Sequence, residues 1–271
     1  MSGISLKRIW MVMLKDWIDV FQNRYILLVA ILLPLLLTAL PLILLGDTQL
    51  ISSQQLGIGT TVPVVGHTDP ALIHLQGTER YQATLASQFM FLFLILALPL
   101  PVAIAAYSIV GEKRERSLEP LLATPLSVTE LLVAKGIASA LPGILSTWLS
   151  FVIYLIVARF IVLSDAVYTA IFTPAWLLAM VLVVPFLTLL SVCIGLMVSS
   201  RSSDPRAAEQ LSTLVILPIL VLFFGQLAAG ISLVNIWTVL IFGILVIAID
   251  VILLRLAVRL FQRETILTRW T

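Results

Sequence analysis

Long apolar runs alternate with short polar segments along almost the whole chain. Six of these runs are each close to the roughly 20 residues that a helix needs to cross a bilayer. Within the fifth run, Pro218 and the Gly225-Gln226 pair could turn part of the chain into a re-entrant segment. The pattern predicts six transmembrane helices, at about residues 25–45, 87–110, 136–160, 175–198, 211–229 and 236–256.

Residues 5–21 precede the first run and have a helical rather than a continuous apolar pattern. Apolar side chains recur there every three or four positions, at Leu6, Ile9, Trp10, Met13, Leu14, Trp17 and Phe21. The polar face holds Lys7, Arg8, Lys15 and Asp19. Tryptophans on an apolar stripe with basic flanks are typical of an amphipathic helix that lies in the membrane interface. We expect such a helix here, with an ordinary packed helix as the alternative.

Composition and charge extend this picture to the whole chain of 271 residues. Hydrophobic residues make up 61% and charged residues only 11%, whereas a soluble domain has about one quarter charged residues. The chain is therefore expected to be a single all-α integral membrane domain. With both termini in the cytosol, fourteen of the sixteen Lys and Arg residues lie on the cytosolic side, and Arg80 and Arg159 do not. Residues 46–84 then form the largest extracytoplasmic segment, and residues 111–135 form a cytosolic loop.

The cytosolic loop is part of the longest charged and polar stretch, GEKRERSLEPLLATPLSVTELLVAKG. Ser117 can cap a short helix that ends at Thr124-Pro125, because a residue before proline is pushed out of the α region. Ser127 and Glu130 form a capping box that starts a second helix, which runs into the third apolar run. Three leucines share one face of the first helix: Leu118, Leu121 and Leu122. An exposed apolar stripe of this kind needs a partner to cover it.

This loop resembles the cytosolic loop of ABC-2 type permeases, the membrane subunits of ABC exporters. Their pattern reads roughly Gly-Glu-Lys-Glu-x-Gly-Thr-Leu-Glu-x-Leu-Leu-x-Thr-Pro-Leu-Ser, followed by Glu-Leu-Leu and a Gly-Lys or Lys-Gly. This chain departs from it where Arg116 and Ser117 replace the usual Gly-Thr. It matches at Gly111, Glu112, Lys113, Leu118, Glu119, Leu121, Leu122, Thr124, Pro125, Leu126, Ser127, Glu130, Leu131, Leu132 and Lys135.

The resemblance implies that the loop docks on a separate nucleotide-binding ATPase, which would carry the ATP and Mg. Two copies of the permease would pair with two ATPases, as a homodimer or with a paralogue. The turn at residues 201–206 would approach the same ATPase. The residues expected to couple ATP-driven closure to the spans are Glu112, Lys113, Arg114, Glu115, Leu118, Glu119, Leu121, Leu122, Thr124 and Pro125.

Polar side chains inside the spans are candidates for a translocation path. Those expected to line it are Ser139, Ser146, Ser150, Tyr154, Gln226 and Asp250. Small residues at this spacing also let helices pack closely, so helix packing is the competing interpretation of the third span. Asp250 could alternatively reach the interface, pair with Arg255 or pair with a polar group of a neighbouring span.

Several classes of function lack their signature residues. The sequence contains no Gly-x-x-x-x-Gly-Lys-Ser/Thr phosphate loop, no His-Glu-x-x-His and no Gly-x-Ser-x-Gly, so catalysis and a cofactor are not expected on this chain. His67 and His74 have no carboxylate or cysteine cluster that would support a metal site. We therefore expect an exporter subunit of the cytoplasmic membrane, surrounded by lipids, with an amphipathic cargo and no nucleic-acid partner. A non-transporting membrane scaffold or assembly factor is the alternative.

Overall fold

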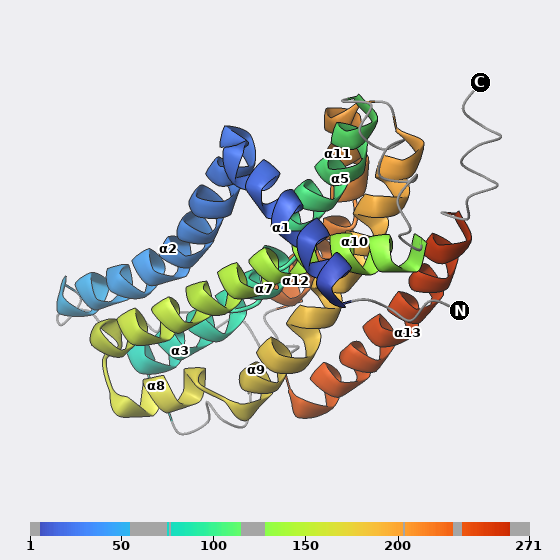
Figure 1. The fold of residues 1–271 in the computed structure, drawn as a ribbon. Coiled ribbons are helices and arrows are strands. Elements are labelled where there is room, and N and C mark those ends of the chain that lie inside the picture. The colour runs from blue at the N-terminus through green and yellow to red at the C-terminus, as the bar shows by residue number, and fades with distance from the viewer. Residues whose placement is uncertain are drawn as a thin grey trace.

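The computed structural model describes residues 6–54, 75, 77–114, 128–202, 204–229 and 235–260, and every regular element in these ranges is a helix (Figure 1). In chain order the helices are α1 (Leu6–Gln22), α2 (Arg24–Gln54), α3 (Gly77–Phe89), α4 (Leu92–Leu96), α5 (Pro99–Arg114), α7 (Val128–Ile161), α8 (Asp165–Ile171), α9 (Pro174–Leu178), the π-helical segment η2 (Ala179–Val183), α10 (Val184–Arg201), α11 (Pro205–Thr213), α12 (Ile216–Ala229) and α13 (Ile236–Leu260).

Six stretches of helix are long and apolar enough to cross a membrane: Ile26–Asp47, Thr78–Gly111, Glu130–Ile161, Asp165–Arg201, Arg206–Ala229 and Ile236–Arg259. They coincide with the six predicted runs, so the prediction of an all-α, multi-pass membrane protein is confirmed. The second, third and fourth stretches begin six to ten residues before the predicted starts. In the second stretch the polar residues of α3 precede the apolar part, and in the fourth the separate helix α8 precedes α9, so the apolar runs alone placed these starts too late.

The structure adds detail to two of the predicted segments. Part of the predicted extracytoplasmic segment at residues 46–84 is helical, because α2 continues to Gln54 and α3 begins at Gly77. The fifth stretch joins α11 to α12 through a short turn at residues 214–215. Pro218 lies in the first turn of α12, where a missing N–H costs little, so it does not break that helix.

The second span, formed by α3, α4 and α5, is the centre of the bundle. In its most apolar window 89% of the residues are buried within the chain, against 22% in the first, fifth and sixth spans. It is interrupted at residues 90–91 and 97–98. Such breaks are tolerated at membrane depth where neighbouring groups satisfy the freed backbone. At the first break the Gln226 amide donates a 3.0 Å hydrogen bond to the carbonyl of Gln88.

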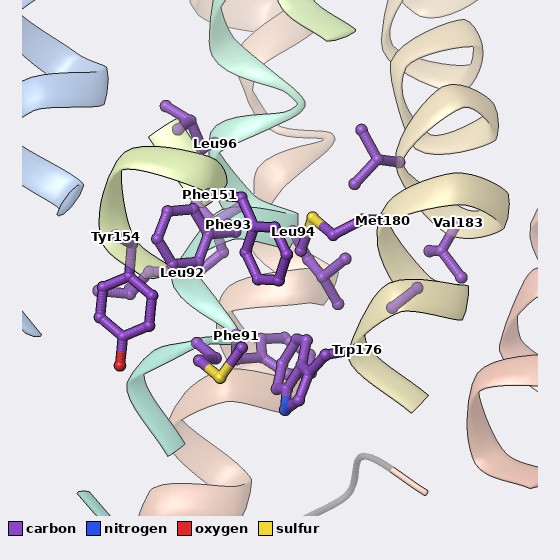
Figure 2. Close-up of a cluster of buried hydrophobic side chains, with 14 of the residues drawn as sticks. Phe91, Leu92, Phe93, Leu94, Leu96, Phe151, Tyr154, Trp176, Met180 and Val183 are labelled. Atoms are coloured by element: carbon purple, nitrogen blue, oxygen red, sulfur yellow. The ribbon is translucent and has the colours of Figure 1, made fainter. Parts of the chain in front are cut away.

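Aromatic and sulfur-containing side chains pack around the interrupted part of this span (Figure 2). The ring of Phe93 lies with its centroid 5.5 Å from that of Phe151 and 5.3 Å from that of Tyr154, both on α7. Met180 of η2 belongs to the same cluster, and its carbonyl accepts a 2.9 Å hydrogen bond from the Trp148 indole. The cluster thus joins the second span to the third and fourth.

Two glycines allow other helices to approach α5 closely. A Cβ atom added at Gly143 of α7 would collide with Cγ of Pro101 and lie 2.8 Å from its Cδ. A Cβ atom added at Gly195 of α10 would lie 2.9 Å from Cβ of Ala105 and 3.3 Å from the carbonyl oxygen of Val102. Because these contacts involve backbone or a rigid ring, α5 is held between α7 and α10 at a distance that only glycine permits.

We predict that Gly143→Ala destabilises the protein, because the Pro101 ring cannot move aside. The expected cost is about 1–3 kcal/mol, typical of overpacking. Gly136→Ala is the matched control on the same helix, since a Cβ atom there meets nothing within 4 Å. The measurement is the unfolding midpoint of the purified protein in mixed micelles titrated with SDS. Equal midpoints for the two variants would contradict the close α5–α7 contact.

Candidate functional site

The structure describes both ends of the predicted cytosolic loop. Helix α5 extends to Arg114 and therefore includes Glu112 and Lys113 in its last turn. Helix α7 begins at Val128 and continues to Ile161 as one helix. Its first residue directly follows Ser127, which is predicted to start a capping box. Outside the described residues lie the other predicted coupling residues, Glu115, Leu118, Glu119, Leu121, Leu122, Thr124 and Pro125.

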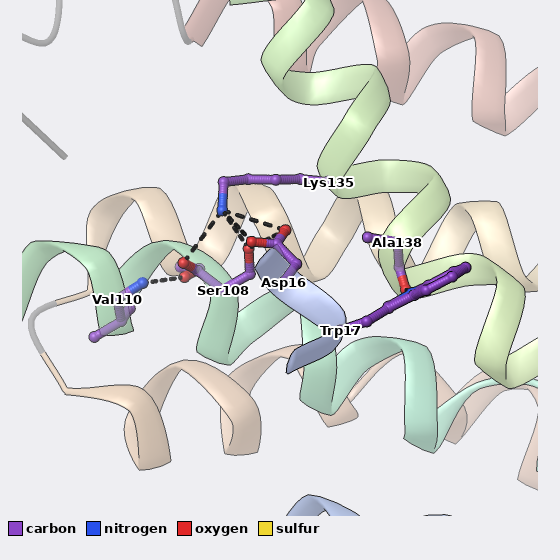
Figure 3. A network of polar contacts seen from close by, with 7 residues as sticks. Asp16, Trp17, Ser108, Val110, Lys135 and Ala138 are labelled. Atoms are coloured by element: carbon purple, nitrogen blue, oxygen red, sulfur yellow. Dashed lines mark hydrogen bonds and ion pairs between the residues drawn. The ribbon is translucent and has the colours of Figure 1, made fainter. Parts of the chain in front are cut away.

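A buried ion pair lies close to the base of this loop (Figure 3). The ammonium of Lys135 on α7 lies 3.4 and 3.5 Å from the two carboxylate oxygens of Asp16 on α1. It also donates a 2.7 Å hydrogen bond to Oγ of Ser108 on α5, and that hydroxyl lies 3.4 Å from the Asp16 carboxylate. Lys135 is 1% exposed and Asp16 is 5% exposed. Three helices are therefore joined by one polar network that is shielded from solvent.

A second contact attaches α1 to α7 one turn further along. Pro142 has no N–H, so the carbonyl of Ala138 loses its usual helical partner four residues later. The indole of Trp17 on α1 donates a 2.9 Å hydrogen bond to this same carbonyl. The apolar side chains of Ile9, Val12 and Met13 pack beside it against α7. A backbone group that a proline leaves unpaired is thus satisfied by the neighbouring helix.

The fourth and fifth spans also reach this region through small polar contacts. Oγ of Ser199 on α10 donates a 2.6 Å hydrogen bond to the carbonyl of Ala106 and accepts a 3.2 Å hydrogen bond from the backbone N–H of Val110, both on α5. Ala208 of α11 packs against the same two α5 residues. We call this region, where Asp16, Ser108, Lys135 and Ser199 bring together α1, α5, α7, α10 and α11, the loop-base junction.

The predicted second turn at residues 201–206 lies next to the loop-base junction. It connects α10 to α11, and both of these helices pack against α5. Arg201, Asp204 and Arg206 are exposed. The structure therefore places these three charged side chains on the surface beside the end of α5 from which the loop leaves.

The face that α1 uses for packing differs from the predicted apolar stripe. The helix itself is confirmed, but its buried positions are Ile9, Val12, Met13, Asp16 and Val20. Leu6, Trp10 and Leu14 belong to the predicted stripe and are exposed. The stripe therefore splits into a buried face that contacts α7 and an exposed face. Whether the second face lies in the membrane interface stays a prediction.

The ion pair itself was missed at the level of sequence. Lys135 is predicted to lie on the cytosolic side, and the structure adds that its side chain is buried within the chain. Asp16 and Lys135 are 119 positions apart, so no local pattern connects them. The available signal was helical spacing, because Asp16 follows Ile9 by seven residues and Met13 by three, which puts a carboxylate on an otherwise apolar face.

The predicted path residues have different neighbours in the structure. Ser139 is buried with no hydrogen-bond partner for its hydroxyl, Ser146 is half-buried and Ser150 is buried. Tyr154 packs on Phe93, and its hydroxyl is also unpaired. Gly143, between these serines, serves close helix packing.

The other two predicted path residues lie on α12 and α13. The Gln226 amide donates a hydrogen bond to the carbonyl of Gln88, beside the break after α3, and Asp250 is buried on α13. A role of the six residues in translocation stays a prediction.

A family model described as an ABC-2 family transporter protein matches residues 10–241. The chain belongs to this family. The match covers the first five candidate spans and the loop with its base, but only the start of the last span, Ile236–Arg259. No curated protein matches the chain. As an ABC-2 family member, the protein is a membrane transport component, and such permeases in general pair with an ATP-binding subunit.

We predict that Lys135→Met destabilises this ABC-2 protein by about 3–5 kcal/mol, because it leaves the Asp16 carboxylate buried without its cation. The double variant Asp16→Asn/Lys135→Met should cost less than the sum of the single variants. Both are measured as unfolding free energies in SDS-titrated micelles, in a double-mutant cycle.

The surface pair between Arg159 and Asp165 provides the control for this cycle. Its charged atoms are 2.7 Å apart, but the two side chains are 51% and 81% exposed. Arg159→Met should therefore cost about 0–1 kcal/mol. If Lys135→Met costs no more than Arg159→Met, burial does not make the Asp16–Lys135 pair important for stability.

Proposed function

We propose that this chain is the permease subunit of an ATP-driven exporter and that a separate ATPase docks on residues 111–135. The ATPase supplies ATP hydrolysis with its own ATP and Mg, and the permease supplies the membrane path. The observation that carries this proposal is the loop-base junction. The segment that resembles an ATPase-docking loop is attached at both ends to helices that a buried ion pair holds together.

Such an attachment suits the transmission of force. Helix α7 has 34 residues and continues as one helix past Pro142, where Trp17 satisfies the freed carbonyl, so it is about 50 Å long and can carry a displacement along its length. A displacement of the loop would move the start of α7, and the Asp16 and Ser108 contacts would carry α1 and α5 with it. Separating Lys135 from Asp16 inside protein is costly, so the helices move together rather than apart.

The orientation that goes with this function places the loop and both termini in the cytosol and the protein in the cytoplasmic membrane. The side chains that α1 leaves exposed support a location of this helix at the membrane surface. Among them are Leu6, Trp10 and Ile18. Tryptophan beside aliphatic residues is favoured at the level of the lipid headgroups. The α1 face opposite its contact with α7 would then contact lipid.

The proposed assembly contains two permease copies and moves an amphipathic cargo. Support for a second copy comes from the exposed apolar side chains of α2, α12 and α13. These helices belong to the three spans in which the smallest share of residues is buried within the chain. Lipid and a second chain can share the covering of these faces. Support for the cargo class is the apolar character of the six spans, which offers little stabilisation to a strongly charged molecule.

The test is the purification of the tagged chain from its native membrane in mild detergent, with the co-purifying polypeptides sequenced. Wild type should retain a polypeptide that contains a Gly-x-x-x-x-Gly-Lys-Ser/Thr phosphate loop. The variant Leu121→Asp/Leu122→Asp should lose most of it, because each carboxylate buried without a partner at an interface costs several kcal/mol, on the order of a 100-fold loss of affinity.

The control is Ala166→Asp/Thr169→Asp on α8, which introduces two carboxylates at exposed positions beyond the far end of α7. This variant should retain the ATPase as wild type does. Loss of the ATPase from both double variants would indicate a general effect of charge or folding. If wild type retains no such ATPase, the scaffold function replaces the exporter.

A further inference from the structure

Helix α13 contacts the rest of the chain along one narrow seam. Its buried positions are spaced by three, four or seven residues and consist of Val239, Gly243, Val246, Asp250 and Ala257. The opposite side of the helix is apolar and exposed, with Trp237, Ile241 and Ile252 among its side chains. At Gly243 an added Cβ atom would lie 3.0 Å from Cδ2 of Leu182 in η2, so the helices meet closely. Asp250 therefore occupies a position in this seam that packing alone would give to an apolar residue.

The carboxyl group of Asp250 is enclosed and has no hydrogen-bond partner. The residue is 2% exposed, and neither of its side-chain oxygens accepts or donates a hydrogen bond. The thiol of Cys193 on α10 lies within electrostatic range of this carboxyl group and is also buried. Among the described residues, the Asp250 carboxyl thus has neither Arg255 nor a polar group of a neighbouring span as a hydrogen-bond partner. The alternative that Asp250 reaches the membrane interface stays a prediction.

The charged groups on the helices around α13 have other positions or partners. Helix α13 packs against α10, η2, α9 and α7. Helix α10 contributes Cys193 and the exposed Arg201, and neither η2 nor α9 has a titratable residue. On α7, Lys135 contacts Asp16, Arg159 contacts Asp165, Tyr154 packs on Phe93 and Glu130 is buried. Arg255 and Arg259 on α13 itself are exposed.

A carboxylate in this position needs a cation, and the site favours a proton. An isolated charge in an apolar interior is so costly that the group neutralises instead. A divalent metal ion would need several oxygen ligands, and the part of the chain that the structure describes has no group of three or more His, Cys, Asp or Glu residues that could hold a metal. A proton needs only the carboxylate itself.

We propose that Asp250 is a proton-binding site within the membrane and that its proton holds the seam between α13 and α10 closed. Release of the proton leaves a charge that must reach water or a cation, so the deprotonated form favours an open seam. Since the proton binds the closed form more tightly, lower pH favours closure and higher pH favours opening. This property belongs to the permease chain and does not require its ATPase.

The first arm of the test asks whether Asp250 carries a proton. Dicyclohexylcarbodiimide is an apolar reagent that reacts with protonated carboxylic acids. The full chain in lipid nanodiscs is treated with it across a range of pH, and the adducts are located by peptide mass spectrometry. Asp250 should be labelled at neutral pH and less so as the pH rises. The exposed, ion-paired Asp165 is the control and should stay unlabelled.

The second arm asks whether the seam opens. Cys193 is the single cysteine of the chain and lies on the α10 side, so its alkylation by a membrane-permeant maleimide reports access to the seam. The thiol itself reacts faster at high pH, and Asp250→Asn corrects for this because it keeps the shape without the charge. The wild-type rate divided by the Asp250→Asn rate should rise with pH, by up to about tenfold per unit when opening releases one proton.

The two arms together decide the proposal. Labelling of Asp250 and a rising ratio support it. A ratio that stays flat or falls overturns it, because a charged Asp250 in a seam that stays closed would repel the thiolate and slow the wild type. Absence of carbodiimide labelling at every pH also overturns it. Asp250→Leu is the second variant, and its Cys193 profile should follow that of Asp250→Asn if charge, and not hydrogen bonding, opens the seam.

Discussion

The ion pair between Asp16 and Lys135 constrains the arrangement of helices at the base of the loop. Each of these charges is buried, so each depends on the other to avoid the cost of an isolated ion in an apolar surrounding. Since the two residues lie on α1 and α7 and share the Ser108 hydroxyl of α5, the three helices must stay in contact for the pair to persist. The first helix is therefore part of the folded bundle and not only an appendage on its surface.

Backbone groups impose a second constraint of the same kind, because a membrane interior offers no water to an unpaired carbonyl. The chain meets it by taking donors from distant segments. Trp17 serves the carbonyl that Pro142 leaves free, and Gln226 serves the break after α3. The Gln226 contact is possible because the interrupted second span lies inside the protein. Irregular helices and a central position in the bundle thus depend on one another.

The helices were predictable because the signals for them are local. An apolar run of sufficient length gives a span wherever it occurs, and the Ser127–Glu130 capping box predicted the start of α7 at Val128. The neighbours of each span were not predictable, because an apolar helix uses the same residues against lipid as against protein. For that reason nothing in residues 87–110 marked this span as the central one. Burial of Lys135 was hidden for a related reason, since its partner lies on another helix.

The contrast between Lys135 and Asp250 indicates how rigid and adjustable regions divide within the molecule. Both residues are buried ionisable groups on membrane helices, but Lys135 has a carboxylate and a hydroxyl beside it and Asp250 has neither. A paired charge stabilises one arrangement, whereas an unpaired acid has two forms, and each form favours a different surrounding. Helices α1, α5 and α7 are thus held in one arrangement beside the loop. The α13 seam is the place where a change of one proton can change the packing of the bundle.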